Sequence, residues 1–330
     1  MPQISIIIPA YNADKTIKET IDSVINQTFK DFEIIIINDG STDRTLDIIS
    51  SIDDPRVQVF SYPNSGASVS RNRGFSKASA QYIAFLDADD LWTSDKLELQ
   101  YAALEADPEA SVAYSWTNYI DQYGEFLYPG FHQSYQGDVY SILLVKNFLE
   151  NGSNPLITRH ALSAIGGFDE SLKGGQDWDL YLRLAAQYKF VCISQAQILY
   201  RISEHSISSN IERQESSCLL VLNKAFNNAP SSLKNLKKDS LSHLYSYLTF
   251  KSLESPLTRK KARIGARCFW MSIYHDPGLI KRRSRMMAIV FVKIIVGLML
   301  PNGQAEPLLK FVKEFKGFFP TTHNSKNLSH

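Results

Sequence analysis

The chain has 330 residues, of which 44% are apolar and 21% charged. Its length suggests two domains, and its abundance of Leu, Ile, Val and Phe excludes disorder over the whole chain. The net charge of +1 conceals an asymmetry, because residues 1–230 carry 17 Lys and Arg against 29 Asp and Glu, whereas residues 231–330 carry 18 against 5. The balance is −12 in the first part and +13 in the second, which predicts that the basic part faces an anionic partner.

The cysteines and the first residues indicate the compartment. Cys192, Cys218 and Cys268 are far apart without a Cys-x-x-Cys pair, which argues against a disulfide framework or a zinc site. An apolar run follows Met1-Pro2-Gln3 directly, without the basic region and cleavage site of a signal peptide. We therefore expect a cytoplasmic protein.

The first half of the chain alternates short apolar runs with amphipathic segments. This order of elements predicts parallel strands joined by right-handed crossovers, and hence an open α/β sheet. The predicted strands are Ile4–Ile8, Glu33–Asn38, Val57–Phe60 and Tyr82–Leu86, and the predicted helices are Lys15–Gln27, a segment that Asp43 can cap, and Ser68–Ser79.

The second half has a different pattern. Nine of the 27 residues from Tyr114 to Tyr140 are aromatic. A helix is predicted over Trp178–Gln187, so that Asp177 would directly precede it. Asn151-Gly152-Ser153 matches a glycosylation sequon, which a cytoplasmic chain would not use. Beyond about residue 210 the pattern is typical of helices joined by polar segments.

Polar residues follow each predicted strand of the first half. Ligands of open α/β sheets bind at the carboxyl ends of the strands, so we expect these residues to converge at one edge of the sheet. They are Pro9-Ala10-Tyr11-Asn12, Asn38-Asp39-Gly40-Ser41-Thr42-Asp43, Asn64-Ser65-Gly66 with Arg71-Asn72-Arg73-Gly74, and Asp87-Ala88-Asp89-Asp90.

The carboxylates of this set indicate which ligands the site would bind. Asp87, Asp89 and Asp90 crowd one strand end, and like charges so close repel unless a cation neutralises them. Oxygen ligands suit Mg²⁺ or Mn²⁺ bridged to a diphosphate, although the segment could also be a solvated turn or cap the next helix. Asp39 is placed to accept hydrogen bonds from a ribose or base, or to form an Asx-turn with Gly40. Arg71 and Arg73 would lie near phosphates or be surface cations.

Together, these motifs resemble a family 2 glycosyltransferase of the GT-A fold over about residues 3–205. Phe85-Leu86 before the acidic segment, Gly166-Gly167-Phe168-Asp169-Glu170 and Asp177-Trp178-Asp179 complete the match. The resemblance implies an open, mostly parallel, Rossmann-like sheet flanked by helices, followed by a helical C-terminal extension. It also implies an inverting, metal-dependent transferase that moves a sugar from a nucleoside-diphosphate sugar, expected to be UDP-linked, to a hydroxyl of a glycan or lipid-linked acceptor.

The resemblance implies a role for each matching residue. The nucleotide-binding residues would be Pro9, Ala10, Tyr11, Asn12, Asp39, Gly66, Arg71 and Asp87, with Asp39 at the base and Asp87 toward the ribose. Asp89 and His205 would hold Mg²⁺ or Mn²⁺. Asp177 would be the catalytic base, while Trp178 and Arg201 would belong to the acceptor or diphosphate loop. The family's usual Glu-Asp pair is Gln176-Asp177 here, which leaves the acceptor role of the missing Glu open.

Three parts of the chain follow from this match. Residues 1–115 would be the nucleotide-sugar-binding half of the GT-A domain, residues 116–210 the acceptor-binding half with the catalytic base, and residues 211–330 a helical, basic extension. Six aromatic residues of the second part could offer faces to a sugar ring or lipid chain, or simply form core beneath loops. They are Trp116, Tyr119, Tyr123, Phe126, Tyr128 and Phe131.

A basic cluster, Lys281-Arg282-Arg283-Ser284-Arg285, stands before the apolar segment Met286–Leu300. This segment has fifteen residues with Lys293 inside, whereas a bilayer span needs about 20 apolar residues. The composition fits peripheral contact through residues 281–300 with the inner face of the cell membrane. A buried helix packed on the acidic body is the alternative.

Two other functions compete with the transferase. Asp87-x-Asp89 also resembles the opening motif of aspartate-nucleophile phosphatases, but that enzyme class would leave Asp39 and Asp177 without a role. A catalytically inactive sugar-nucleotide-binding protein is the third possibility, against which the presence of Asp89 and Asp177 argues. We expect no nucleic-acid partner.

Overall fold

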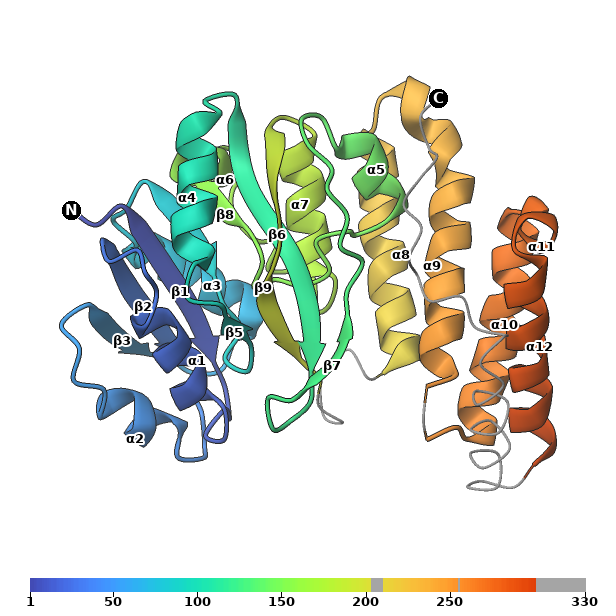
Figure 1. The fold of residues 1–330 in the computed structure, drawn as a ribbon, viewed down its shortest axis with the longest axis horizontal. Helices are drawn as coiled ribbons and strands as arrows, with labels where there is room; N and C mark the ends of the chain where they lie inside the picture. Colours follow the sequence, from blue (N-terminus) through green and yellow to red (C-terminus); the bar gives the residue numbers. More distant parts are fainter. Residues whose placement is uncertain (203–209, 255, 301–330) are drawn as a thin grey trace. The chain divides into compact units, whose positions relative to one another are not determined.

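The computed structural model describes residues 1–202, 210–254 and 256–300. The chain divides into two compact units, one formed by Met1–Lys237 and one that begins at Lys238 (Figure 1). The first unit holds a mixed α/β fold. In the described residues of the second unit, all regular structure is helical.

Nine strands of the described residues form one sheet in the first unit, in the order β3-β2-β1-β4-β8-β6-β9-β5, with β7 paired to β6. Neighbours among β1 to β4 are parallel, as are β6 and β9, whereas β5, β7 and β8 run antiparallel to their neighbours. The predicted open, mostly parallel sheet is therefore confirmed. The strands are β1 (Ile4–Ala10), β2 (Phe32–Asn38), β3 (Val57–Ser61), β4 (Tyr82–Phe85), β5 (Leu91–Trp92), β6 (Ala110–Ile120), β7 (Phe126–Pro129), β8 (Leu156–Thr158) and β9 (Lys189–Arg201).

Alternate residues of β1 face opposite sides of the sheet, as the pleat of a strand requires. Ile6 shares an apolar cluster with Ile21 of α1 (Ile17–Ile25) and Leu97 of α4 (Lys96–Ala106). Ile7 faces the other side, toward α3 (Ala67–Lys77), where Gly74 allows the helix to approach closely. A Cβ at Gly74 would lie 2.3 Å from Ile7 Cγ2, so this position tolerates no larger residue without a shift. Each fully buried Ile contributes about 1.5–3 kcal/mol.

Besides α1, α3 and α4, the described residues of the first unit form further helices, among them the one that carries Asp177. The predicted helix over Trp178–Gln187 exists as α7, but it begins two residues earlier, and Asp177 therefore lies inside its first turn rather than before it. Gly175 precedes this turn with φ of +68°, a conformation natural to glycine. The helices are α2 (Thr45–Ser50), α5 (Tyr140–Val145), α6 (Arg159–Ala164), α7 (Gln176–Ala185), α8 (Ile211–Asn228) and the 3₁₀-helix η2 (Ser231–Leu236).

The described helices of the second unit are α9 (Lys237–Ser252), α10 (Arg259–His275), α11 (Gly278–Arg282) and α12 (Ser284–Met299). Helix α12 buries Met287, Val290 and Ile294 in a cluster with Phe269 of α10. This stripe recurs every three to four residues, as expected of one helical face. Within the described ranges, every helix falls short of the length and apolar character that crossing a bilayer requires.

Candidate active site

The loops after β1 and β2 are tied together at the carboxyl edge of the sheet. Asn12 Oδ1 accepts a hydrogen bond from the Thr42 N–H at 2.8 Å, and the Asn12 N–H donates to Ser41 Oγ at 3.1 Å. Pro9 and Ala10 are the last residues of β1 and pair with the last residues of β2, so they lie at this edge of the sheet. The Tyr11 side chain is half exposed beside them and offers a flat face.

Asp39 links the loop after β2 to the start of α3. Its two carboxylate oxygens accept the backbone N–H groups of Ser65 at 2.9 Å and Gly66 at 2.8 Å. The Arg73 guanidinium lies 3.6 Å from the same carboxylate. Gly66 has φ of +92° and open space where a Cβ would be. An ionised carboxylate has acceptor capacity beyond two hydrogen bonds, so Asp39 can still receive a donor from a ligand.

Asp87 and Arg71 form an ion pair at the end of β4. The Arg71 side chain is 8% exposed, so its interpretation as a surface cation is wrong. Its guanidinium lies 5.1 Å from the centre of the Phe168 ring. Gly152 completes the surroundings, because a Cβ there would lie 3.4 Å from Arg71 Nη2 and 3.6 Å from Asp87 Oδ2.

The two acids that follow Asp87 have different environments. Asp90 is fully buried, accepts hydrogen bonds from Ser153 Oγ at 2.5 Å and the Arg201 N–H at 3.0 Å, and has its pKa raised well above the usual range by burial. Asp89 is partly exposed, and burial together with the nearby Asp87 charge raises its pKa to about 6. Asp90 thus belongs to the framework, while Asp89 offers a carboxylate to a ligand.

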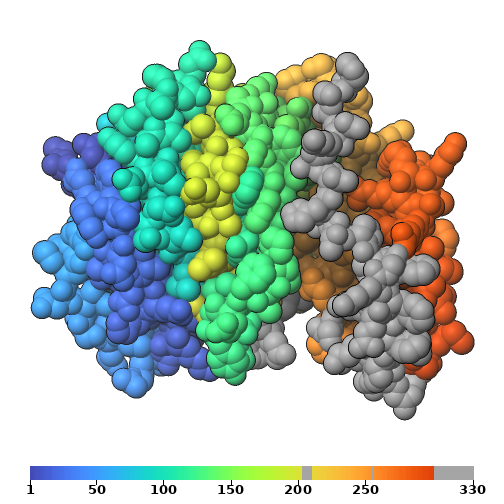
Figure 2. All heavy atoms as spheres, in the orientation of Figure 1, coloured from blue at the N-terminus to red at the C-terminus, as the bar shows by residue number. Residues whose placement is uncertain are grey.

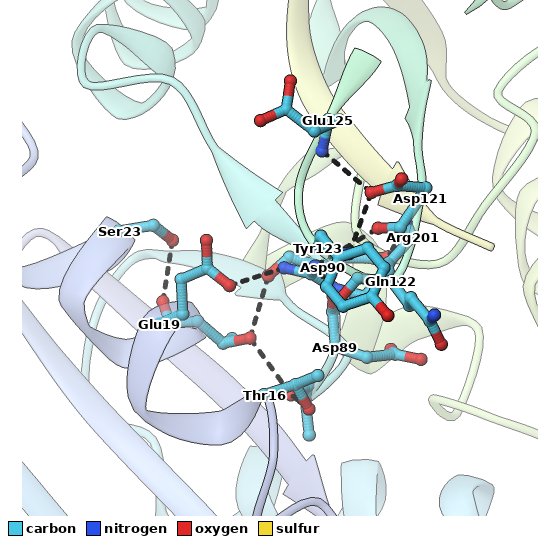
Figure 3. A network of polar contacts seen from close by, with 12 residues as sticks. Thr16, Glu19, Ser23, Asp89, Asp90, Asp121, Gln122, Tyr123, Glu125 and Arg201 are labelled. Atoms are coloured by element: carbon cyan, nitrogen blue, oxygen red, sulfur yellow. Dashed lines mark hydrogen bonds and ion pairs between the residues drawn. The ribbon is translucent and has the colours of Figure 1, made fainter. Parts of the chain in front are cut away.

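Arg201 is the centre of the polar network in Figure 3. Its Nε donates to the Asp89 carbonyl at 2.8 Å, its Nη2 donates to Glu19 Oε2 at 2.7 Å, and its Nη1 donates to the Asp121 and Gln122 carbonyls at 3.3 and 3.1 Å. The side chain is almost fully buried. In this structure Arg201 therefore fixes the Asp89 backbone, α1 and the β6–β7 turn, and its predicted contact with a diphosphate stays a prediction.

Asp177 lies near the Arg71–Asp87 pair. Burial raises the pKa of its carboxyl, the Arg71 charge lowers it and the Asp87 charge raises it. Asn147 Nδ2 donates to Asp177 Oδ2 at 3.4 Å. Asp177 is thus a partly exposed carboxylate with a pKa above that of an ordinary aspartate, within electrostatic reach of the other predicted site residues.

Asp179, two residues further along α7, has different contacts. Its carboxylate is buried and paired with Arg183 at 2.8 Å and Lys224 at 2.8 Å. Lys224 also binds Asp169 at 2.6 Å, and this hydrogen bond, together with that of Ser171, holds the pKa of Asp169 at about 2. These contacts are those of a structural ion-pair network that joins α7, α8 and the Asp169 loop.

Asn72 joins α3 to the Gly-Gly-Phe-Asp-Glu segment. Its Oδ1 accepts the Phe168 N–H at 2.9 Å, and its Nδ2 donates to the Phe168 carbonyl and to Glu170 Oε1, both at 2.9 Å. Gly167 has φ of +69°, and a Cβ there would lie 2.7 Å from Asn72 Oδ1. Arg71 and Phe168 are brought together by this connection.

The predicted site also includes Trp178 and His205. The Trp178 indole is buried and donates to the Leu143 carbonyl at 2.9 Å. His205 lies outside the described residues. Of the six aromatic residues predicted to offer faces, Trp116 and Tyr119 are partly buried, and the exposed ones are Tyr123, Phe126, Tyr128 and Phe131.

Residues 151–153 are neighbours of the predicted site residues that the sequence interpretation missed. Ser153 Oγ accepts the Asp87 N–H at 3.0 Å and donates to Asp90, while the Asn151 carbonyl accepts the Tyr181 hydroxyl at 2.7 Å. Asn151 and Ser153 are buried, so the match to a sequon had no structural meaning. Apart from that match, only the run of small polar residues marked this segment.

The donor set at Asp87 and Asp89 fits a divalent cation. Burial and the nearby Asp87 charge raise the pKa of Asp89, and a cation would relieve the repulsion between the two carboxylates. Within the described ranges, no group of three or more His, Cys, Asp or Glu side chains is arranged to hold a metal ion. The residues present therefore fit Mg²⁺ or Mn²⁺ that takes its remaining ligands from a substrate and water.

The family model "Glycosyltransferase like family 2" matches residues 5–252. The chain belongs to glycosyltransferase family 2. This transferase is 26% identical, over 97% of its length, to the hyaluronan synthase of Pasteurella multocida, and 28% identical, over 87%, to the chondroitin synthase of P. multocida strain Pm70. It spans about a third of the length of these relatives, 34% and 31%.

Solved structures show the same GT-A fold for this glycosyltransferase. Residues 1–349 of TarS from S. aureus, in complex with UDP-GlcNAc, match with a TM-score of 0.62 at 18% identity, over 90% of this chain and 89% of that one. The mannosyltransferase PcManGT from Pyrobaculum calidifontis, in complex with GDP-Man and Mn²⁺, matches with 0.57 at 17%, over 90% and 87%. With the family shown, we do not retain the phosphatase interpretation of Asp87 and Asp89.

Proposed function

We propose that this chain transfers a sugar from a UDP-sugar to a hydroxyl of a glycan or lipid-linked acceptor, with inversion at the anomeric carbon and with Mg²⁺ or Mn²⁺. The observation that carries the proposal is the gathering of Arg71 from α3, Asp87 from the end of β4 and Asp177 from α7 at the carboxyl edge of the sheet. The complex of TarS with UDP-GlcNAc supports a UDP-linked donor, and relatives named hyaluronan and chondroitin synthase support a glycan acceptor.

The proposed donor site lies in residues 1–115. The exposed face of Tyr11 and the carboxylate of Asp39 would bind the base, Asp87 would face the ribose, and Gly66 would leave space beside them. Asp89, together with Asp87, would hold the metal ion. When bound, this ion would neutralise negative charge on the leaving diphosphate.

The proposed acceptor half, residues 116–210, supplies the base. Asp177 would take the proton as the acceptor oxygen attacks the anomeric carbon from the face opposite the diphosphate. The O–H bond breaks, the new C–O bond forms and the bond to the diphosphate breaks, which inverts the configuration. The raised pKa of Asp177 makes its carboxylate a stronger base, while the Arg71 charge favours the ionised form.

Donor hydrolysis tests the proposal without knowledge of the acceptor. Wild-type protein is incubated with UDP-, GDP- and dTDP-sugars and Mn²⁺, and release of nucleoside diphosphate is measured. Slow hydrolysis of a UDP-sugar is expected, and it should disappear in Asp89→Asn. Nucleotide binding without any turnover, with or without added glycans, would instead support the inactive binding protein.

The basic extension, residues 211–330, suggests the location. Lys281, Arg282, Arg283 and Arg285 are exposed, and the outward face of α12 exposes Phe291, Val292, Ile295 and Met299. Each basic residue near an anionic surface is worth about 1 kcal/mol. We therefore propose peripheral contact through residues 281–300 with the cytoplasmic face of the membrane, which would suit a lipid-linked acceptor.

A further inference from the structure

Glu150 is an acid that the proposed mechanism does not use. Its backbone has φ of +72°, a conformation that residues other than glycine rarely adopt. Its Oε1 accepts a hydrogen bond from the Tyr119 hydroxyl at 3.0 Å, and its Oε2 accepts the Phe131 N–H at 3.1 Å. Such a backbone persists only where the surrounding contacts hold it.

The chain opposite Glu150 leaves room for this carboxylate. A Cβ at Gly130 would lie 2.4 Å from Glu150 Oε2 and 2.7 Å from the Thr117 carbonyl, so only glycine fits there without a shift. Burial raises the pKa of the Glu150 carboxyl to about 7. Burial therefore disfavours the charged form, and the hydrogen bonds from the Tyr119 hydroxyl and the Phe131 N–H offset part of that cost.

Glu150 also lies beside the reaction centre. Asn147, three residues earlier, contacts the Asp177 carboxylate, and Gly152, two residues later, lies against Arg71 and Asp87. Two residues span at most about 7 Å, so the Glu150 backbone lies within about 7 Å of Gly152, the residue beside Arg71 and Asp87.

Aromatic side chains stand next to this carboxylate. Tyr128 of β7 is 44% exposed and Phe131 is 48% exposed. The Tyr128 ring stacks on that of Tyr119, which donates to Glu150, with centres 4.9 Å apart. Figure 2 shows the segment between β7 and α5, in green, at the surface beside the yellow strand β9, to which Gly137 bridges.

We propose that Glu150 and the exposed rings of Tyr128 and Phe131 form a subsite for a pyranose residue of the acceptor. The rings would cover the apolar face of the sugar, and the carboxylate would accept hydrogen bonds from its hydroxyls. A carboxylate at this position fits the hydroxyls of a sugar and disfavours an acyl chain. The subsite supplies the acceptor contact that the Gln176-Asp177 sequence leaves open. This inference rests on the proposed function, because it assigns the acceptor side of the same site.

Binding of simple glycosides tests the subsite. The probes are the p-nitrophenyl β-glycosides of glucose, galactose, N-acetylglucosamine and glucuronic acid, followed by saturation-transfer NMR. Wild-type protein should bind at least one of them. Glu150→Gln should weaken that binding about tenfold or more, as loss of a charged hydrogen-bond acceptor predicts. Glu125→Gln, which changes an exposed acid in the connection between β6 and β7, is the matched control and should bind like the wild type.

Two further measurements distinguish loss of the subsite from misfolding and from failure of the donor reaction. Acceptor-free hydrolysis of the UDP-sugar should be unchanged in Glu150→Gln. If the variant fails to fold, Phe131→Ala, which keeps the backbone N–H, should still lose glycoside binding. Wild-type affinity in Glu150→Gln, or no glycoside binding by the wild type, would overturn the subsite. If the wild type hydrolyses no UDP-sugar, the proposed function is contradicted. The subsite is still tested in that case, because glycoside binding is measured without a donor.

Discussion

Arg71 of α3 and Asp87 at the end of β4 form an ion pair in which the Arg71 side chain is 8% exposed and the Asp87 side chain 29% exposed. The pair stands between the loop that would bind the donor and the first turn of α7, where Asp177 lies. Removing one partner of such a pair leaves an uncompensated charge, so we expect the orientation of Asp87 to depend on Arg71.

Replacement of Arg71 by lysine tests this dependence. Arg71→Lys keeps the positive charge but loses the planar fork that fits a carboxylate. We expect the dissociation constant for UDP in Mn²⁺ to rise about tenfold or more, as measured by calorimetry. Arg56→Lys is the control, because Arg56 pairs with Asp54 at the start of β3, at the opposite end of the strands. Equal UDP affinity in both variants would remove Arg71 from the donor site.

Metal removal tests the roles of Asp87 and Asp89. The wild type should bind UDP at least about tenfold more tightly in Mn²⁺ than in EDTA, because the cation joins the carboxylates to the diphosphate. In Asp89→Asn the two conditions should give the same affinity. If EDTA leaves wild-type affinity unchanged, UDP binding does not involve the metal.

The ion pair of Asp169 and Lys224 predicts a dependence of stability on acidity. The hydrogen bond from Lys224 holds the pKa of Asp169 at about 2 in the folded state, below its ordinary value of 3.8. A depressed pKa stabilises the fold above the unfolded pKa, and this stabilisation is lost as the pH falls from about 4 to 2. The loss should be about 1–2 kcal/mol in the free energy of unfolding.

Denaturant unfolding at pH 6 and pH 3 measures this effect. Asp169→Asn should be less stable than the wild type at pH 6, and the difference should shrink at pH 3. A difference of the same size at both pH values would mean that the ionised pair is not its source.

The strands and loops of the first half could be predicted because buried parallel strands are continuous apolar runs. Ile34–Ile37 is such a run, and Asp39 follows it as expected. The antiparallel strand β8 (Leu156–Thr158) between β4 and β6 could not be predicted, since three residues show no periodicity.

The contacts that bury Arg71 and Arg201 could not be predicted from local sequence patterns either. Arg201 contacts Glu19, 182 positions away, and Ser153 bridges to Asp87 and Asp90 across more than 60 positions. Such partners depend on the tertiary fold, which sequence periodicity does not specify. The family motif indicates which residues belong to the site, whereas only the structure distinguishes the partly exposed Asp89 and Asp177 from the buried Asp90 and Asp179.

Vesicle binding tests the proposed membrane contact. Replacing the four basic residues of segment 281–285 by glutamine should abolish co-sedimentation with phosphatidylglycerol vesicles, because the electrostatic attraction is lost. Wild-type binding should weaken as salt rises. A variant with four exposed lysines of the first unit replaced by glutamine carries the same net charge and should still sediment; these are Lys15, Lys18, Lys30 and Lys77. Failure of the wild type to sediment would exclude the contact.

The assignment of Asp177 as the base can be separated from a structural role by comparison with Asp179. Asp177→Asn keeps the shape of the side chain but cannot accept the proton, so kcat should fall by at least about 10²-fold while melting temperature and UDP affinity stay near wild type. Asp179→Asn breaks two ion pairs and should lower the melting temperature instead.

The most direct measurement is the rate of sugar transfer from the UDP-sugar to a glycan acceptor by purified Asp177→Asn at saturating donor and Mn²⁺. The account predicts a folded protein that binds UDP like the wild type and transfers sugar at no more than about one hundredth of the wild-type rate. Transfer at the wild-type rate would contradict it.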